Sequence, residues 1–531
     1  MKKKRIIIIT GLVVIILLAV AAYVLLILKD KDNNKKRKEK TINSTVKKSK
    51  YTLAGNSLED FDLYFMQLEN ENVNKIYSPL SIKYALAMLN EGAKGETRKQ
   101  IENVIGDYEA KQYNNSSNLS LANAMFIKND FEDSVKNDYI DTLKKNYNAE
   151  VVYDDFTTPD KVNTWVSEKT LNLINNLVSD ISDYNFILIN ALAIDMDWNE
   201  KFLENKGMSI SYAHEKFGWG SPQTVIGNIF NNNDTVAGME IDASLNNYDI
   251  VTKLGEDSIR DTVSKAYRDY MNDPENAAEV ELMLGGDNSE EHINQIINDY
   301  LESYISEIDS NYKRVDVNTE FMLYVDDTVK AFAKDLKEYD GTTLQYVGIM
   351  PISEDLNSYI ANMDAKKINK IIGSLKELKL ENFNDGLVTR IKGFIPKFKF
   401  EYNLDLMRDL KKLGINDVFD SKKSDLTHIS DTKGLYVDDA IHKANIEFTQ
   451  DGIKASAATM IGGRGAGGGF NYWFDVPVER IDLTFDRPYM FFIRDKQSGE
   501  VWFAGTVYEP TPWSEDADYH ENDLYRQNED Y

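Results

Sequence analysis

Residues 442–459 read HKANIEFTQDGIKASAAT, and this stretch decides the fold. The side chains that follow Gly452 and Ile453 are mostly small and uncharged. Glycine then dominates residues 462–469 (GGRGAGGG), which indicates a flexible loop. The same glycines formally match a dinucleotide-binding fingerprint, but that motif must open a helix, and here it runs into Phe-Asn-Tyr-Trp. We therefore interpret the segment as an exposed loop, and we expect no cofactor.

Strand patterns surround this loop on both sides. Residues 489–495 and 501–507 predict a pair of strands joined by the turn KQSG, and residues 391–401 alternate between apolar side chains and lysine. Residues 186–194 (FILINALAI) are almost wholly apolar, which predicts a strand that is buried on both faces. The second half of the chain is therefore rich in strands.

Helical patterns come earlier in the chain. Ser78 is a good N-cap and Pro79 suits the first turn, so a helix should begin there and end near Gly92. Residues 134–147 and 161–177 also have helical spacing. Helices that come mostly before strands predict the α+β class.

Several blocks, in one consistent order, resemble the serpin family. The blocks are YSPLSI at 77–82, ALAML at 85–89, GAKGET at 92–97, LANA at 121–124, N-x-WV-x-x-KT at 163–170, NA at 190–191 with Trp198 and Phe202, IPKF at 395–398, LKKLGI at 410–415, HKA at 442–444, DGIKASAAT at 451–459 and DRPYMFFIR at 486–494. They cover about 56–202 and 320–510. The resemblance implies a large central mixed β-sheet, two smaller sheets, about nine helices and an exposed reactive-centre loop at about 450–478.

The resemblance also implies a function. The chain would not be an enzyme. It would inhibit extracellular serine proteases, with cysteine proteases as a further target class, and the target protease would be its partner. That protease would cleave the loop, become acylated and be trapped when the loop inserts into the central sheet. The implied hinge consists of Gly452, Ile453, Lys454, Ala455, Ser456, Ala457, Ala458 and Thr459. Small side chains favour rapid insertion, and Ile453 is bulkier than the family's usual residue.

The cleaved bond is implied only by counting along the loop. Counting forward from the hinge glycine leads to Ala466-Gly467, which suits an elastase-like or subtilisin-like protease. Arg464-Gly465 is the alternative, and it suits a trypsin-like protease. Counting back from Pro488 leads near Pro477 instead, so the loop is longer than is usual in the family.

The resemblance assigns structural roles to five further residues. Ser78, Ser81, Asn190 and His442 would form the shutter, a buried hydrogen-bonded cluster where the sheet opens. Trp198 would lie in the breach, where the loop first enters. A catalytic role for His442 is disfavoured because the chain has only five histidines and no Gly-x-Ser-x-Gly motif. No two histidines have the spacing of a helical metal site, and we expect neither a catalytic residue nor a metal.

Charge divides the chain unevenly. Residues 1–50 carry 14 basic and three acidic side chains, so the remainder must hold about −37 to give the net charge of −26. A body this acidic repels phosphates, and we expect no nucleic-acid partner and a monomer. Residues 514–531 predict a disordered acidic tail. The absence of cysteine excludes disulfides and zinc–thiolate sites. Richness in isoleucine, lysine and asparagine indicates a bacterial source.

The N-terminus predicts a membrane anchor. Residues 6–28 carry no charge, and a helix of this length spans about 34 Å, enough to cross a bilayer. A cleaved signal peptide is the alternative, since residues 19–21 read AVA, but the apolar run continues beyond them. Basic residues 29–40 would hold the body in the cytoplasm by charge alone. The family resemblance instead favours an anchor at 1–28 in the cell membrane and an extracellular body.

The resulting organisation has four parts. An anchor at 1–28 and a basic tether at 29–55 precede a serpin domain at 56–513, and the acidic tail follows. About 207–315 is an inserted block beyond the family pattern. Two other functions stay open: a non-inhibitory serpin, or a surface binding protein that uses the acidic insert.

Overall fold

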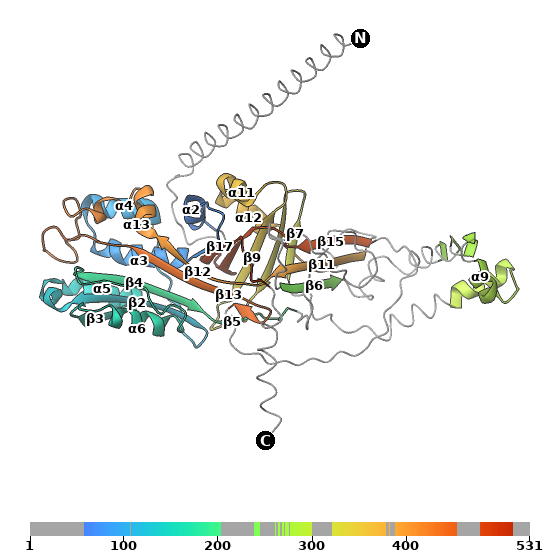
Figure 1. Ribbon diagram of the computed structural model, residues 1–531, viewed down its shortest axis with the longest axis horizontal. Coiled ribbons are helices and arrows are strands. Elements are labelled where there is room, and N and C mark those ends of the chain that lie inside the picture. The colour runs from blue at the N-terminus through green and yellow to red at the C-terminus, as the bar shows by residue number, and fades with distance from the viewer. Residues whose placement is uncertain are drawn as a thin grey trace, which may run out of the picture.

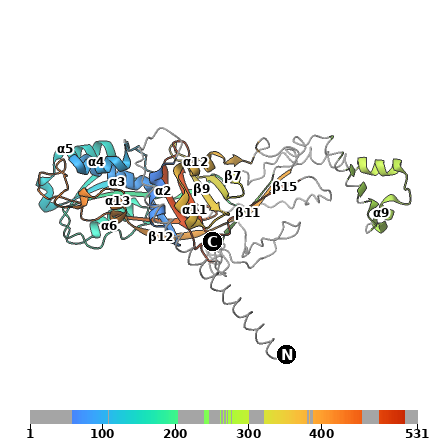
Figure 2. The same ribbon diagram turned by 90° about the horizontal axis from the view of Figure 1, so that it is seen from above.

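The computed structural model describes residues 58–106, 108–202, 238–244, 321–378, 382, 388–453 and 478–512, with part of 257–299. In this part of the chain no helix is long and apolar enough to cross a membrane. The predicted anchor, tether and acidic tail lie outside the described residues. Figures 1 and 2 show α4, α5 and α6 toward one end of the body and β11 and β15 toward the other.

The largest sheet has seven strands, and every neighbouring pair in it is antiparallel. Its order is β1 (Lys75–Tyr77), β17 (Val501–Val507), β16 (Tyr489–Asp495), β9 (Leu344–Pro351), β8 (Val329–Asp335), β7 (Met322–Val325) and β10 (Lys376–Glu377). Every residue of β9, β16 and β17 is buried, because helices and other strands cover both faces. The predicted C-terminal strand pair is confirmed with the expected bounds. A second sheet joins β15 (Val478–Thr484), β11 (Val388–Pro396) and β6 (Gly238–Ser244).

Two further sheets are joined by one continuous segment of the chain. One is β3 (Glu150–Asp154), β2 (Leu119–Lys128) and β4 (Phe186–Ile194). The other is β12 (Phe398–Asp405), β13 (Ile441–Phe448), β14 (Gly452–Ile453) and β5 (Met196–Asp197). The chain runs directly from β4 through Asp195 into β5, so these two sheets are connected at one end. The β2–β3 pair is parallel and the other pairs are antiparallel, which makes this connected surface the mixed sheet.

Nine α-helices and two 3₁₀ helices have bounds within the described residues, apart from further helical residues within 257–299. They are α2 (Asp60–Leu68), α3 (Pro79–Gly92), α4 (Gly95–Ile105), α5 (Asn137–Tyr147), α6 (Asp160–Lys169), α9 (Ala277–Leu284), α11 (Leu356–Asn362), α12 (Ala365–Gly373) and α13 (Leu406–Lys412), with η1 (Asn129–Ser134) and η5 (Asp417–Phe419). The total is eleven rather than about nine. Among these residues hydrogen bonding also gives four separate sheets rather than one large and two smaller ones.

The start of α3 follows the sequence prediction. Ser78 is the N-cap, and its Oγ accepts a hydrogen bond from the backbone N–H of Ser81 at 3.0 Å. Such a cap satisfies one of the donors that a helix start leaves unpaired. Pro79 occupies the first helical position. The cap therefore fixes Ser78 and Ser81 at a defined place beside β4 and β13.

The helix predicted at 161–177 is wrong in its second half. It ends at Lys169, and Leu171 and Asn172 have φ of 53° and 60°, which are left-handed conformations. The Thr170 hydroxyl donates to the Val166 carbonyl at 2.7 Å and accepts from the Ile174 N–H at 3.1 Å. Threonine competes in this way with the helical backbone bonds, and it ends the helix.

Candidate functional site

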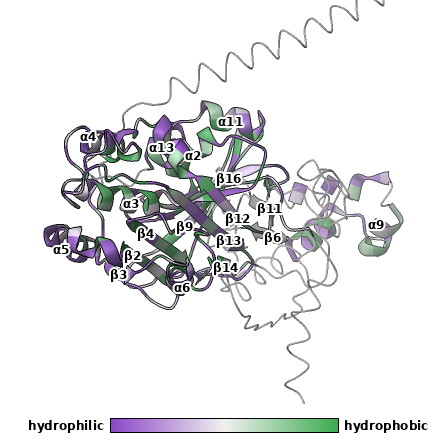
Figure 3. Ribbon diagram, turned by 60° about the vertical axis from the view of Figure 1, so that its left-hand side comes forward, coloured by the Kyte–Doolittle hydropathy of each residue, from purple (hydrophilic) through white to green (hydrophobic). Residues whose placement is uncertain are grey.

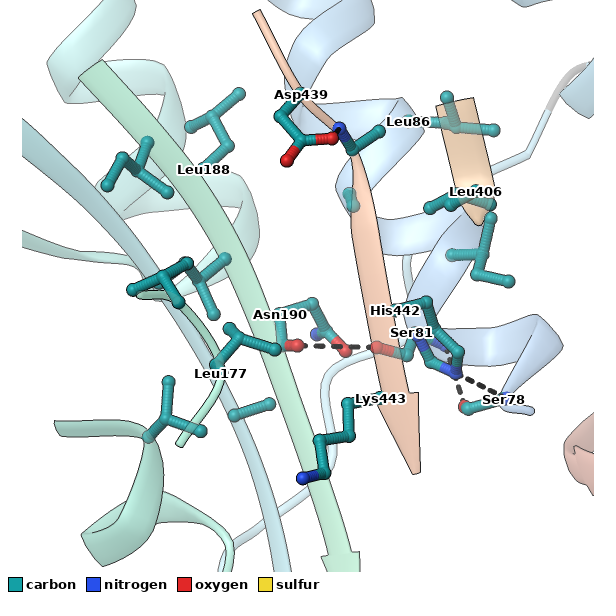
Figure 4. Close-up of a pocket in the computed structure, with 18 of the residues that line it drawn as sticks. Ser78, Ser81, Leu86, Leu177, Leu188, Asn190, Leu406, Asp439, His442 and Lys443 are labelled. Carbon is teal, nitrogen blue, oxygen red and sulfur yellow. Dashed lines mark hydrogen bonds between the residues drawn. The ribbon is translucent and has the colours of Figure 1, made fainter. Parts of the chain in front are cut away.

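The structure brings together the four residues predicted to form the shutter. His442 lies on β13, and its Nε2 accepts a hydrogen bond from the backbone N–H of Ser78 at 2.9 Å. The Ser81 hydroxyl donates to the backbone carbonyl of Asn190, on β4, at 3.3 Å. The start of α3 thus bridges β4 and β13 (Figure 4). These two strands do not pair with each other in the described residues, and we call the gap between them the break in the mixed sheet.

Burial sets the charge of His442. The ring is buried, and this desolvation lowers its pKa from 6.5 to about 4. The imidazole is therefore neutral at pH 7. A neutral ring is also what the geometry requires, because Nε2 can accept from the Ser78 N–H only when it carries no proton. His442 acts here as a hydrogen-bond acceptor that holds β13 against α3.

A second asparagine, which the sequence did not single out, extends this cluster. Asn190 Nδ2 donates to Asn123 Oδ1 at 2.7 Å, and Asn123 Nδ2 donates to the carbonyl of Tyr147 at 2.7 Å. The two asparagines are opposite each other in the register of β2 and β4. Asn190 Oδ1 is buried and accepts no hydrogen bond within the described residues. One acceptor beside the break therefore has no protein donor among the described residues.

The two strands that border the break do not pair with each other. In the described part of the chain β4 pairs only with β2, and β13 pairs with β12 and β14. A cavity of about 160 Å³ lies between them, lined by residues 186–192 of β4 and residues 442–444 of β13. Apolar side chains of α3 and α13, including Leu86 and Leu410, form its floor. The first half of β4 is only half-buried for this reason, contrary to the prediction of burial on both faces.

The predicted hinge begins at the closed end of this break. Gly452 pairs with Asp197 and Ile453 pairs with Met196 of β5, while Ile453 also pairs with Phe448 of β13. Two residues of the loop thus already form a strand between β5 and β13. Below Ile453, a second cavity of about 10 Å³ shares Ile174 and Leu192 with the larger one. Residues 454–459, and the bonds Ala466-Gly467 and Arg464-Gly465, lie outside the described residues.

Trp198 holds the chain just before this point. It is fully buried, and its indole Nε1 donates to the carbonyl of Thr449 at 2.9 Å. Its backbone N–H donates to the carbonyl of Asp451 at 2.9 Å, and its ring packs edge-on against Phe448. Lys201 forms an ion pair with the Asp451 carboxylate at 2.6 Å. These contacts fix the start of the loop beside β5, at the place predicted for the breach.

A sequence profile of the family described as "Serpin (serine protease inhibitor)" matches residues 56–216 and 285–510, which is well over half of the chain. The chain belongs to the serpin family. The match breaks at 217–284, within the block that the sequence suggested as an insertion.

Individual serpins match either most of the chain or about a third of it, at low identity. Neuroserpin of Mus musculus is 24% identical over 472 residues, which cover 83% of this chain and 87% of that protein. Leukocyte elastase inhibitor A of Mus musculus is 33% identical over 175 residues, 32% of this chain and 42% of its own length. Among solved structures, the thermophilic serpin tengpin in its native state has a TM-score of 0.54 at 20% identity, covering 85% of this chain and 93% of its own.

Gly452 is the one position of the seated hinge where a side chain cannot fit. A Cβ there would overlap the carbonyl oxygen of Met196 and lie 2.7 Å from the Cα of Asp197, and both are backbone atoms. Gly452→Ala should therefore displace residues 452–453 from the serpin's sheet and destabilise the native state by about 1–3 kcal/mol. Hydrogen exchange at Ile453 and urea unfolding would measure both effects.

Gly373 provides the matched control for this prediction. It ends α12, and a Cβ there meets no atom within 4 Å. Gly373→Ala should leave exchange at Ile453 unchanged and alter stability by less than about 1 kcal/mol. Equal exchange in both variants would contradict the seated position of the hinge.

Proposed function

We propose that this serpin inhibits extracellular serine proteases by suicide cleavage of its reactive loop, with cysteine proteases as a second target class. The single observation that supports this most strongly is that the break between β4 and β13 continues from the point where Gly452 and Ile453 already lie in the sheet. Ile453 already lies between β5 and β13, and the cavity between β4 and β13 continues from it. A cleaved loop can extend this strand by pairing with two edges that have no partner in the described residues.

The chemistry at the bond is acyl transfer. The target's serine hydroxyl attacks the carbonyl carbon of Ala466, the bond to the nitrogen of Gly467 breaks, and the hydroxyl proton leaves with the new amine. The acyl-enzyme ester then joins the protease to the segment that ends at Ala466. Insertion of residues 454–459 and beyond draws that protease away before water can hydrolyse the ester. A cysteine protease would form a thioester by the same step.

The proposed shutter residues fit this movement. Among the described residues, the start of α3 links β4 and β13 through two hydrogen bonds, from Ser78 to His442 and from Ser81 to Asn190. Insertion could widen the break without dismantling a β-ladder. Asn190 Oδ1, which lacks a donor in the described residues, could be satisfied by a strand that enters beside it. The names of relatives such as leukocyte elastase inhibitor A and plasminogen activator inhibitor 1 agree with inhibition.

Trapping is directly measurable. We expect the full chain, incubated in turn with trypsin, elastase and subtilisin, to form a complex with at least one of them that survives SDS. Its mass should be the sum of the two proteins less a C-terminal peptide. A peptide that begins at Gly467 would assign the bond to Ala466-Gly467, and one that begins at Gly465 would assign it to Arg464-Gly465.

Clean cleavage with full protease activity remaining would contradict inhibition. It would favour a non-inhibitory serpin, or a surface binding protein that uses the block at 207–315. Heat stability of the cut chain separates these two outcomes, because loop insertion without trapping still raises the unfolding temperature.

The location of the domain is part of the proposal. Residues 6–28 would cross the cell membrane once, and residues 29–55 would tether the serpin domain outside the cell. The support is the uncharged run in the sequence together with the function of an inhibitor that meets extracellular proteases. Resistance of the chain to carbonate extraction, with digestion of its body on intact cells, is the expected result.

A further inference from the structure

Four lysines, on one helix and on the strand that follows it, have no carboxylate partner among the described residues. Lys366, Lys367 and Lys370 lie on α12, and Lys376 lies on β10 just after it. All four are exposed, and none forms an ion pair with any acid of the described chain. Lys367 instead has its Nζ 4.4 Å from the centre of the Tyr359 ring. We call these four residues the α12 lysine face.

Helix spacing brings these charges together. Lys366 and Lys370 are four residues apart and Lys367 and Lys370 are three apart, so the like charges are neighbours and repel one another. The opposite side of the helix is apolar and buried, through Ile368, Ile371 and Ile372. The lysines therefore cannot turn inward. The lysines keep this mutual repulsion although the body has a net charge of about −37 and therefore offers many acidic side chains as partners.

Two acids at the N-terminal end of α12 are occupied by backbone donors. Asp364 is the N-cap and accepts from the Lys367 N–H at 2.7 Å, and Asp60 accepts from the Ala365 N–H at 2.9 Å. Both carboxylates thus satisfy backbone donors at the positive end of the helix dipole. Glu377 follows Lys376 on β10 and forms no ion pair with it. The ammonium groups of the four lysines take no part in this capping, and they form no ion pair with an acid of the described residues.

The chain reaches the body at this same helix. The N–H of Leu58, the first described residue, donates to Asn369 Oδ1 at 2.9 Å, and Asn369 Nδ2 donates back to the Leu58 carbonyl at 2.7 Å. Asn369 lies on α12 beside Lys370. Leu58 therefore lies at the edge of the α12 lysine face, and the last lysines that precede it in the sequence are Lys47, Lys48 and Lys50.

We propose that the α12 lysine face docks on the anionic phospholipid surface of the membrane that holds residues 6–28. This inference rests on the proposed anchor, and it adds an orientation to it. A chain of the predicted tether's length has a root-mean-square span of about 30 Å, so the body stays within reach of the headgroups and a weak contact is sufficient. Lysines within a Debye length of an anionic surface are attracted to it, and the acidic remainder of the body is repelled.

Docking in this way fixes which side of the inhibitor faces outward. α12 and its neighbour α11 lie on the opposite side of the body from β13 and β14 (Figures 1 and 3). The break between β4 and β13, together with the start of the loop at Gly452, would then point away from the membrane. A soluble protease could approach the loop without steric hindrance from the lipid.

Energy transfer from a protein dye to a lipid acceptor tests this orientation. The chain has no cysteine, so one introduced cysteine is a unique label. Gly373→Cys places it at the end of α12, where a Cβ meets no atom within 4 Å, and Thr164→Cys places it on an exposed position of α6. The full chain is reconstituted in vesicles of phosphatidylcholine, with or without phosphatidylglycerol, and flotation reports anchoring separately.

On anionic vesicles at low salt we expect transfer from position 373 to exceed that from 164 by at least about twofold. The excess should vanish in about 0.5 M NaCl, on neutral vesicles, or in Lys366→Gln/Lys370→Gln/Lys376→Gln. The control variant Lys144→Gln/Lys145→Gln/Lys422→Gln removes three other exposed, unpaired lysines and should keep it. Flotation with equal transfer from both positions would overturn the docking face alone. Failure to float would overturn the anchor and the docking together, while leaving protease trapping as a separate question.

Discussion

Ile453→Arg should convert this serpin from an inhibitor into a substrate. Ile453 is only 2% exposed and lies between β5 and β13, where insertion would begin. An arginine there would need its charge buried without a partner, and the penalty for one uncompensated ion is several kcal/mol. Insertion should then be slower than hydrolysis of the acyl-enzyme ester. We expect the fraction of reacted chains that end as SDS-stable complex to fall by at least about 100-fold.

Ile453→Thr is the matched control for that change. Threonine is also β-branched but smaller and uncharged, so it should keep its place in the sheet and preserve trapping within about threefold. Both variants are measured as the ratio of complex to cleaved chain on denaturing gels. Undiminished trapping by Ile453→Arg would show that burial of residue 453 in the sheet is not needed for insertion, and the proposed mechanism would fail.

Acid should weaken the native state through His442. Burial lowers the pKa of this histidine from 6.5 to about 4, so the unfolded chain takes up a proton at a higher pH than the folded chain does. No difference exists above pH 6.5, and stability is lost as the pH falls from there to about 4. At 1.36 kcal/mol for each pKa unit, the total loss is about 3 kcal/mol. Protonation would also remove the acceptor that Ser78 uses.

The histidine contribution can be isolated with His442→Gln. Glutamine can accept a hydrogen bond from the Ser78 N–H but does not titrate. All other titratable groups are the same in the wild-type chain and the variant. Urea unfolding at several pH values between 7 and 4 should give parallel curves above pH 6.5. Below it, the wild-type chain should lose up to about 3 kcal/mol more than the variant. Curves that stay parallel down to pH 4 would mean that His442 is protonated in the folded chain.

Local features of the fold could be predicted from sequence. The Ser78-Pro79 start of α3 and the strand pair β16–β17 depend on neighbouring residues, so caps, proline and alternation reveal them. The end of α6 was missed because Thr170 ends the helix through side-chain hydrogen bonds, while the apolar spacing continues past it.

The site was predictable only through the family resemblance. Ser78 and His442 are 364 positions apart, and no spacing in the sequence indicates that one accepts from the other. Asn123 was missed for the same reason, since its partnership with Asn190 depends on the register of β2 and β4. The sequence also could not predict that Gly452 and Ile453 already lie within the sheet. Their seating depends on Met196 and Asp197, which are more than 250 positions away.

The facing edges of β4 and β13 affect how the protein behaves at high concentration. Backbone groups on these edges that are unpaired among the described residues could accept an extended segment, whether it belongs to the same molecule or to another. Insertion of a molecule's own loop is a first-order process, whereas insertion of a neighbour's loop rises with concentration. Confinement of many copies to a membrane plane would raise the local concentration, so surface density would set the balance between single inhibitors and linked chains.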